Sequence, residues 1–218
     1  MRFSNRLEAA SLLSDRLAAY QGRHPLVLGV PRGGVPMGRV IADALDGDLD
    51  VVLVRKLRAP GQAELAIGAV DEAGAVLKGS YFDLASDHYV QEEVRTQLEI
   101  LRRRRELYTH ARPAIDPAGR VAIIVDDGVA TGSSMLSAIH SVRARRPERI
   151  VVAIGVAPPD TIERLAVEAD EVQCLLAPDG FYAVGQFFAD FSEVTNEMVV
   201  AALTRPVAPG GATRVTRS

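Results

Sequence analysis

The chain has 218 residues and a mass of 23.4 kDa, which fits one domain with a small accessory element. Hydrophobic residues make up 48% and charged residues 24%, as in an ordinary globular protein, so long-range disorder and a fibrous architecture are excluded. The formal net charge of −3 leaves no basic surplus for general nucleic-acid binding.

Cysteine content and hydropathy bear on the cellular compartment of the protein. Cys174 is the single cysteine, so the chain has neither an internal disulfide nor a multi-cysteine metal site, and we expect a buried, inert thiol. There is no apolar run of about 18 residues that would predict a membrane span, and the amphipathic N-terminus has no apolar signal core. We therefore expect a cytoplasmic protein with no membrane or nucleic-acid partner.

Hydrophobic periodicity predicts alternating helices and short, buried, β-rich strands. In chain order we expect helix 6–20, strand 26–30, helix 36–46, strand 50–54, a polar loop 55–64, a hairpin of 65–70 and 75–78, a long helix 87–110, strand 121–125, helix 133–145, strand 150–156, helix 160–169, strand 172–176 and helix 192–203. Residues 204–218, rich in Arg, Pro and Gly and without acids, are expected to form a disordered tail. This alternation is typical of an α/β fold with a central parallel sheet flanked by helices, in which ligands bind beyond the carboxyl ends of the strands.

The strongest functional signal is the strand end at residues 125–134, Val-Asp-Asp-Gly-Val-Ala-Thr-Gly-Ser-Ser. Asp126 and Asp127 end a hydrophobic strand, and a loop of small residues then opens a helix. Backbone N–H groups in such a loop, at a helix N-terminus, suit a phosphate. Two carboxylates beside it suit the vicinal hydroxyls of a ribose 5-phosphate. A capped loop with two solvated aspartates is the structural alternative.

This segment resembles the PRPP-binding motif of type I phosphoribosyltransferases, in which two acids hold the ribose 2- and 3-hydroxyls and a Thr-Gly loop holds the 5-phosphate. The resemblance implies a phosphoribosyltransferase domain over 1–203 with the type I fold, a small hood at about 177–191, a mobile loop at about 55–66 and an inserted helix at about 87–110. The PRPP-binding residues would be Asp126, Asp127, Val129, Ala130, Thr131, Gly132, Ser133 and Ser134.

A second strand end carries Pro31-Arg32-Gly33-Gly34. Paired glycines let the backbone approach an anion closely, and Arg32 offers a charged fork for phosphate oxygens. On these residues alone a structural turn is an equal alternative, and the pattern is not the GxGxxG of dinucleotide sites. Beside the acid pair it resembles the family's pyrophosphate loop, formed by Arg32, Gly33 and Gly34, in which the peptide entering the basic residue is often cis.

A third segment, residues 55–64, is either an exposed polar loop or the family's mobile loop, which folds over pyrophosphate and excludes water. In the second case Lys56 and Arg58 would neutralise the leaving group, and Glu64 is a candidate proton acceptor. Hypoxanthine-guanine enzymes have an aspartate before the Thr-Gly pair, where this chain has Ala130. The sequence is therefore closer to the adenine and orotate types.

A fourth segment, residues 178–191, holds five of the eleven aromatic residues. Such clustering usually means core packing, but this segment resembles the hood over the base in purine phosphoribosyltransferases. Phe181 or Tyr182 would stack on the base, and Asp190 could reach metal or base. The spacing between Val184-Gly185 and Asp190 is one residue longer than in the family.

The resemblance implies a Mg²⁺-dependent transfer of the 5-phosphoribosyl group from PRPP to a nitrogenous, purine-like base, with release of pyrophosphate. The substrate would carry most of the Mg²⁺ coordination, with Asp126, Asp127 and Asp190 as candidate protein ligands. A homodimer is one expectation, and the inserted helix is a candidate either for the dimer contact or for a cap over the site. The alternatives are a non-catalytic PRPP or nucleotide sensor on the same fold, and a phosphate-dependent hydrolase or receiver-like domain. A sensor has no need of Lys56, Arg58 and Glu64, so these residues favour an enzyme.

Overall fold

Five parallel strands form the central sheet of the computed structural model, which describes residues 2–110 and 114–204, without the side chains of Ala63 and Glu64. The strand order is β2-β1-β6-β7-β8, and every neighbouring pair is parallel. The strands are β1 (Leu26–Gly29), β2 (Asp48–Val51), β6 (Val121–Gly128), β7 (Arg149–Val156) and β8 (Glu171–Leu176). The expected α/β class with a central parallel sheet is thus confirmed, and all five carboxyl ends meet at one edge.

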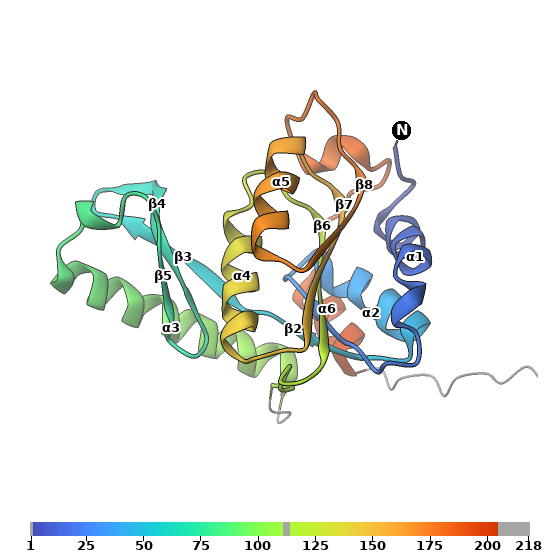
Figure 1. The fold of residues 1–218 in the computed structure, drawn as a ribbon. Coiled ribbons are helices and arrows are strands. Elements are labelled where there is room, and N and C mark those ends of the chain that lie inside the picture. The colour runs from blue at the N-terminus through green and yellow to red at the C-terminus, as the bar shows by residue number, and fades with distance from the viewer. Residues whose placement is uncertain (1, 111–113, 205–218) are drawn as a thin grey trace, which may run out of the picture.

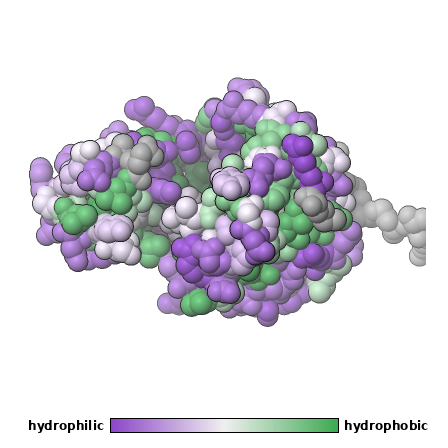
Figure 2. Space-filling model, turned by 90° about the horizontal axis from the view of Figure 1, so that it is seen from above, coloured by the Kyte–Doolittle hydropathy of each residue, from purple (hydrophilic) through white to green (hydrophobic). Residues whose placement is uncertain are grey.

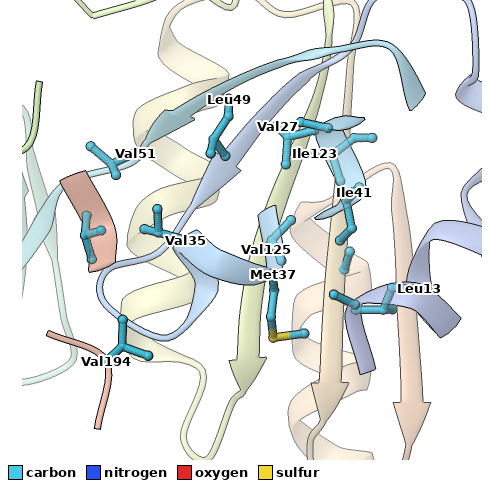
Figure 3. Close-up of a cluster of buried hydrophobic side chains, with 14 of the residues drawn as sticks. Leu13, Val27, Val35, Met37, Ile41, Leu49, Val51, Ile123, Val125 and Val194 are labelled. Carbon is cyan, nitrogen blue, oxygen red and sulfur yellow. The ribbon is translucent and has the colours of Figure 1, made fainter. Parts of the chain in front are cut away.

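Helices cover both faces of this sheet because the strand residues are apolar on both sides. One face packs against α1 (Arg6–Arg16), α2 (Gly34–Leu45) and α6 (Asn196–Thr204), and the other against α4 (Ser133–Ala144) and α5 (Pro159–Glu168). Figure 3 shows Ile123 and Val125 among the side chains of the first face, with Met37 and Leu13 of α2 and α1. Ile124 packs on the second face. Side chains of β6 therefore alternate between the two helical layers, which decides where the acids that follow will point.

An arm projects from this core, as Figures 1 and 2 show. It consists of a three-stranded antiparallel sheet of β3 (Val54–Ala59), β4 (Gln62–Asp71) and β5 (Val76–Lys78), backed by the long helix α3 (Asp87–Thr109). Three short 3₁₀ turns complete the described structure: η1 (Ala18–Tyr20), η2 (Phe82–Leu84) and η3 (Val184–Phe187).

The prediction of a polar loop over residues 55–64 is wrong, because this segment forms β3, a tight turn and the start of β4. Leu57 and Ala59 are buried, whereas Lys56 and Arg58 are exposed, so the segment alternates as a strand with one covered face. Gly61 has a φ of +70° and follows Pro60, the residue order of a type II turn. A search for continuous apolar runs misses this strand, because here the charged Lys56 and Arg58 alternate with buried residues.

The remaining expected elements are present with shifted ends. The hairpin around Asp71–Gly74 and the long helix are confirmed, and the long helix packs on β3 and β4 of the arm as well as on α6. The last helix begins at Asn196, later than predicted. Residues 205–218 of the expected tail lie outside the described residues, and the expected homodimer stays a prediction.

Two expectations about single features can also be compared with the structure. Cys174 is half-buried rather than fully buried, and burial raises the pKa of its thiol to about 11, so the thiol stays protonated at neutral pH. Within residues 2–110 and 114–204, no helix has the length and apolar character needed to cross a membrane.

Candidate functional site

The two acids, Asp126 and Asp127, are the residues just before the end of β6, at the carboxyl edge of the sheet. Strand alternation directs Asp127 to the side of α1 and α2, and Asp126 to the side of α4. The backbone N–H of Asp127 donates to Oδ1 of Asp126 at 2.9 Å. The two carboxylates of the acid pair therefore lie on opposite sides of β6, with Asp127 against the β1–α2 loop.

Burial dominates the electrostatics of the acid pair. It raises the pKa of Asp126 well above its ordinary range, and the negative charge of Asp127 raises it further. Burial also raises the pKa of Asp127, against the opposing effect of a hydrogen bond from the Arg6 guanidinium. Two carboxylates held so close together favour a ligand that brings positive charge or hydroxyl donors.

Arg6, at the start of α1, is a site residue that the sequence did not indicate. Its Nε–H donates to Oδ2 of Asp127 at 2.7 Å, and its Nη1–H donates to the carbonyl oxygen of Ser192 at 2.7 Å. Its guanidinium carbon lies 3.9 Å from the ring centroid of Phe191. Because Arg6 and Asp127 are 121 residues apart, no local motif could have revealed the pair.

The loop between β1 and α2 lies directly against the acid pair. A Cβ atom added to Gly33 would lie 2.1 Å from Oδ2 of Asp127, and one added to Gly34 would lie 2.2 Å from the carbonyl oxygen of Val125. Glycine is therefore required at both positions by close approach. The peptide bond between Pro31 and Arg32 is cis, which confirms that expectation. The Arg32 side chain forms an ion pair with Glu193.

The small-residue loop after β6 leads into the N-terminus of α4. Val129 is buried and donates its N–H to the carbonyl oxygen of Val156, whereas Ala130 and Thr131 are exposed. Gly132, with a φ of +77°, is the residue before the first turn of α4. Three residues with hydroxyl groups lie at this helix end: Thr131, Ser133 and Ser134. The hydroxyl oxygens of Thr131 and Ser133 are 3.3 Å apart. A helix N-terminus with hydroxyl groups beside it can hold a phosphate.

The predicted hood divides into a packed part and an exposed part. Phe187 and Phe188 are buried, and Phe181 stacks on Phe187 with ring centroids 5.6 Å apart, so much of the aromatic cluster is core packing. Tyr182 is 92% exposed, so its side chain is open to a ligand.

The hood also contacts the acid strand and carries the last acid of the predicted site. A Cβ atom added to Gly128 would lie 2.5 Å from Cγ1 of Val184, so the hood packs on the end of β6. Asp190 is exposed and accepts hydrogen bonds from the N–H and hydroxyl of Ser192, which hold its pKa below the ordinary value.

The arm carries two of the predicted catalytic residues, Lys56 and Arg58, and one of them shares a cavity with the start of α4. Lys56 lines a cavity of about 390 Å³ between the arm and α4, together with Ser133 and His140. Arg58 is exposed farther along β3, where its backbone N–H donates to Glu93 of α3. The side chain of Glu64 lies outside the described residues.

The side chains that could donate ligands to a metal ion show how such an ion could bind. Among the described side chains, no group of three or more His, Cys, Asp or Glu could hold a metal ion. The two carboxylates of the acid pair are oxygen ligands of the kind Mg²⁺ accepts, and Mg²⁺ commonly completes its shell with water and substrate phosphates. The residues present therefore fit a cation that arrives with a phosphorylated ligand.

The parallel sheet, with an acid pair and two small-residue loops at one edge, defines an α/β protein of the type I phosphoribosyltransferase fold. The family model for the phosphoribosyl transferase domain matches residues 5–191. This match spans most of the chain, so the chain belongs to the phosphoribosyl transferase domain family.

Three known proteins are similar to the chain over 93% of its length. Two, from Mycobacterium tuberculosis strains CDC 1551 and H37Rv, are each 42% identical over 209 residues and bear the name "Putative phosphoribosyl transferase". The chain spans about half of their length, namely 46%. The crystal structure of TT1426 from Thermus thermophilus is 46% identical, has a TM-score of 0.84 and is covered over 98% of its own chain.

Proposed function

We propose that the chain is a Mg²⁺-dependent phosphoribosyltransferase that transfers the 5-phosphoribosyl group of PRPP to a nitrogenous, purine-like base and releases pyrophosphate. One observation carries the proposal. In a chain of this family, the acid pair, the Pro31–Gly34 loop and the hood are in contact at one edge of the sheet. Vicinal hydroxyls suit the acid pair, a pyrophosphate suits the Pro31–Gly34 loop, and the ring of a base suits the hood.

The ribose phosphate would bind between the acid pair and α4. Asp126 and Asp127 would accept hydrogen bonds from the 2- and 3-hydroxyls, since carboxylates are strong acceptors. The loop from Val129 to Ser134 would hold the 5-phosphate through its backbone N–H groups and hydroxyls, aided by the positive end of the α4 dipole.

The pyrophosphate would leave along the β1–α2 loop and the arm. The backbone at Gly33 and Gly34 is free of side chains and can approach phosphate oxygens, and Arg32 would add charge once it exchanges Glu193 for the ligand. Lys56 and Arg58 would neutralise the pyrophosphate as its bond to ribose C1 breaks. Asp126, Asp127 and Asp190 are the candidate protein ligands for Mg²⁺, which when bound would supply positive charge that stabilises the leaving pyrophosphate.

The base would lie under the hood. The exposed ring of Tyr182, or Phe181 beside it, would stack on the base while a base nitrogen forms the new bond to C1. Asp190 would reach the base or the metal, and Glu64 would accept the proton that the base gives up. Holding both reactants in line accounts for most of the expected rate gain, because the protein needs no covalent step of its own.

A non-catalytic PRPP- or nucleotide-binding regulatory protein is the second candidate. The segment that carries Lys56 and Arg58 is a hydrogen-bonded hairpin backed by α3, not a free loop. Closing it over pyrophosphate would require movement of the hairpin, whereas a sensor needs no closure.

Pyrophosphate release separates these candidates. The purified chain is incubated with PRPP and each of a panel of purine and pyrimidine bases, with Mg²⁺ and with EDTA. We expect release that depends on both a base and Mg²⁺. Binding of PRPP without release for any base would favour the sensor, and absence of PRPP binding would contradict both.

A further inference from the structure

Arg6 lies where the acid pair, the β1–α2 loop and the hood come together. Arg6 contacts the acid pair through Asp127 and the hood through Phe191, and it also bonds the carbonyl oxygen of Ser192, the residue that follows the hood. A Cβ atom added to Gly33 would also lie 3.3 Å from its Nε. No other described hydrogen bond or ion pair joins the acid pair to the hood segment.

The guanidinium is held on three sides at once. Its two hydrogen bonds are 2.7 Å long, its face lies on the Phe191 ring, and the side chain is only 13% exposed. A planar fork can bond a carboxylate and a carbonyl while stacking on a ring, which a lysine ammonium cannot do in the same geometry. The position of Phe191 is therefore tied to that of Asp127.

The chain before Arg6 reinforces this connection. The N–H groups of Ala189 and Asp190 donate to the carbonyl oxygens of Phe3 and Ser4, at 2.7 and 2.9 Å. The hood thus pairs with the segment that leads into α1, and Arg6 is the first residue of that helix. A shift of Arg6 relative to Asp127 would therefore displace the hood, both through these backbone hydrogen bonds and through the contact of the Arg6 side chain with Phe191.

We infer that Arg6 is a positioning residue that couples the acid pair to the hood, so that a ligand contact with Asp127 changes the order of the hood residues 181–192. The consequence for ligands rests on the proposed function, because there the acid pair binds the ribose and the hood covers the base. Binding of the ribose at the acid pair would then change, through Arg6, the order of the hood residues that cover the base.

The coupling is tested first without ligand, by amide hydrogen exchange of peptides spanning 181–192. We expect Arg6→Met to speed exchange at Ala189 and Asp190 by about tenfold, which is the size of one charge-assisted hydrogen bond. Asp127→Asn should act in the same direction, and the double variant should exchange no faster than the faster single variant. Arg16→Met is the matched control: Arg16 lies on the same helix and bonds the Cys174 carbonyl away from the hood.

The conservative variant separates a positioning role from a role of charge alone. Arg6→Lys keeps the positive charge beside Asp127 but cannot make the fork, so hood exchange should stay faster than in wild type. Full restoration by Arg6→Lys would overturn the inference. So would unchanged hood exchange in Arg6→Met, or additive effects in the double variant. If Arg6→Met fails to fold, Arg6→Lys and Asp127→Asn still decide the question.

In a second experiment, PRPP with Mg²⁺ is added to the wild type and to Arg6→Met, and hydrogen exchange of the hood is measured again. We expect ligand to change hood exchange in the wild type, and this response to be lost in Arg6→Met even where calorimetry shows that PRPP still binds. Binding to the wild type without any hood response would overturn the inference and leave the proposed function intact. No binding to the wild type would overturn the proposed function, while the ligand-free measurements would still decide the coupling.

Discussion

Gly34 lies directly against Val125 at the carboxyl edge of the sheet: a methyl group on Gly34 would be 2.2 Å from the Val125 carbonyl oxygen. The obstacle is backbone of a central strand and cannot move aside as a flexible side chain could. We expect Gly34→Ala to lower the free energy of unfolding by about 2–4 kcal/mol, the range of severe core strain. Urea denaturation measures this loss.

The matched control for this prediction is Gly180→Ala. An added Cβ at Gly180 meets nothing within 4 Å, and its backbone does not have a positive φ. Its unfolding free energy should stay within about 0.5 kcal/mol of wild type. A Gly34→Ala variant as stable as Gly180→Ala would show that the β1–α2 loop is not locked against the acid strand.

Asp126 is predicted to cost stability in the empty protein at neutral pH. Burial, and then the charge of Asp127, raise the pKa of Asp126 well above its ordinary value of 3.8. Because the folded state holds this proton more tightly than the unfolded chain, the free energy of unfolding falls as the pH rises from that ordinary value toward the raised one. Asp126→Asn should remove this loss and raise Tm at neutral pH.

Thermal melts across a pH series, in EDTA, measure the effect of Asp126→Asn. Each kcal/mol gained corresponds to roughly 2–4 °C in Tm for a chain of this length. The gain should shrink as the pH falls toward the ordinary value of 3.8 and vanish below it, where the wild-type carboxyl is protonated in both states. Asp179→Asn, at an exposed loop position, is the control. A gain that does not change with pH would contradict this electrostatic explanation.

The arm is attached to the core by a buried ion cluster around Arg105. Its guanidinium lies 2.8 Å from Asp50 Oδ1 and 2.6 Å from Glu72 Oε1, and Asp50 is only 1% exposed. Arg105→Met would leave buried negative charge without this cation, so we expect a loss of about 3–5 kcal/mol in unfolding free energy. Arg103→Met, at an exposed position on the same helix, should cost little. Equal urea midpoints for the two variants would refute this role of Arg105.

The sequence predicted the central sheet well because its strands are apolar on both faces and stand out as continuous runs. It predicted β3 poorly because Lys56 and Arg58 alternate with the buried residues of a strand that has only one covered face. The acid pair and both loops were visible as local motifs next to strand ends. The Arg6–Asp127 and Arg105–Asp50 pairs were not, because folding alone brings together residues 121 and 55 positions apart.

Lys56 is the residue that best separates an enzyme from a sensor. It lines the cavity between the arm and α4, and the proposed function assigns it to neutralising the leaving pyrophosphate. We expect Lys56→Ala to reduce pyrophosphate release by about 100-fold or more, the lower end of the effect of losing one group that stabilises transition-state charge. Arg103→Ala, exposed on α3, should release pyrophosphate at the wild-type rate. Unchanged turnover in Lys56→Ala would remove Lys56 from the reaction.

Calorimetric titration of PRPP into the wild type and into the Asp126→Asn/Asp127→Asn double variant, each with and without Mg²⁺, tests the central claim most directly. The proposed function predicts binding to the wild type that requires Mg²⁺ and is lost in the double variant, because the ribose hydroxyls and the cation both depend on the two carboxylates. Absence of binding to the wild type, or undiminished binding to the double variant, would contradict the assignment of the acid pair to PRPP.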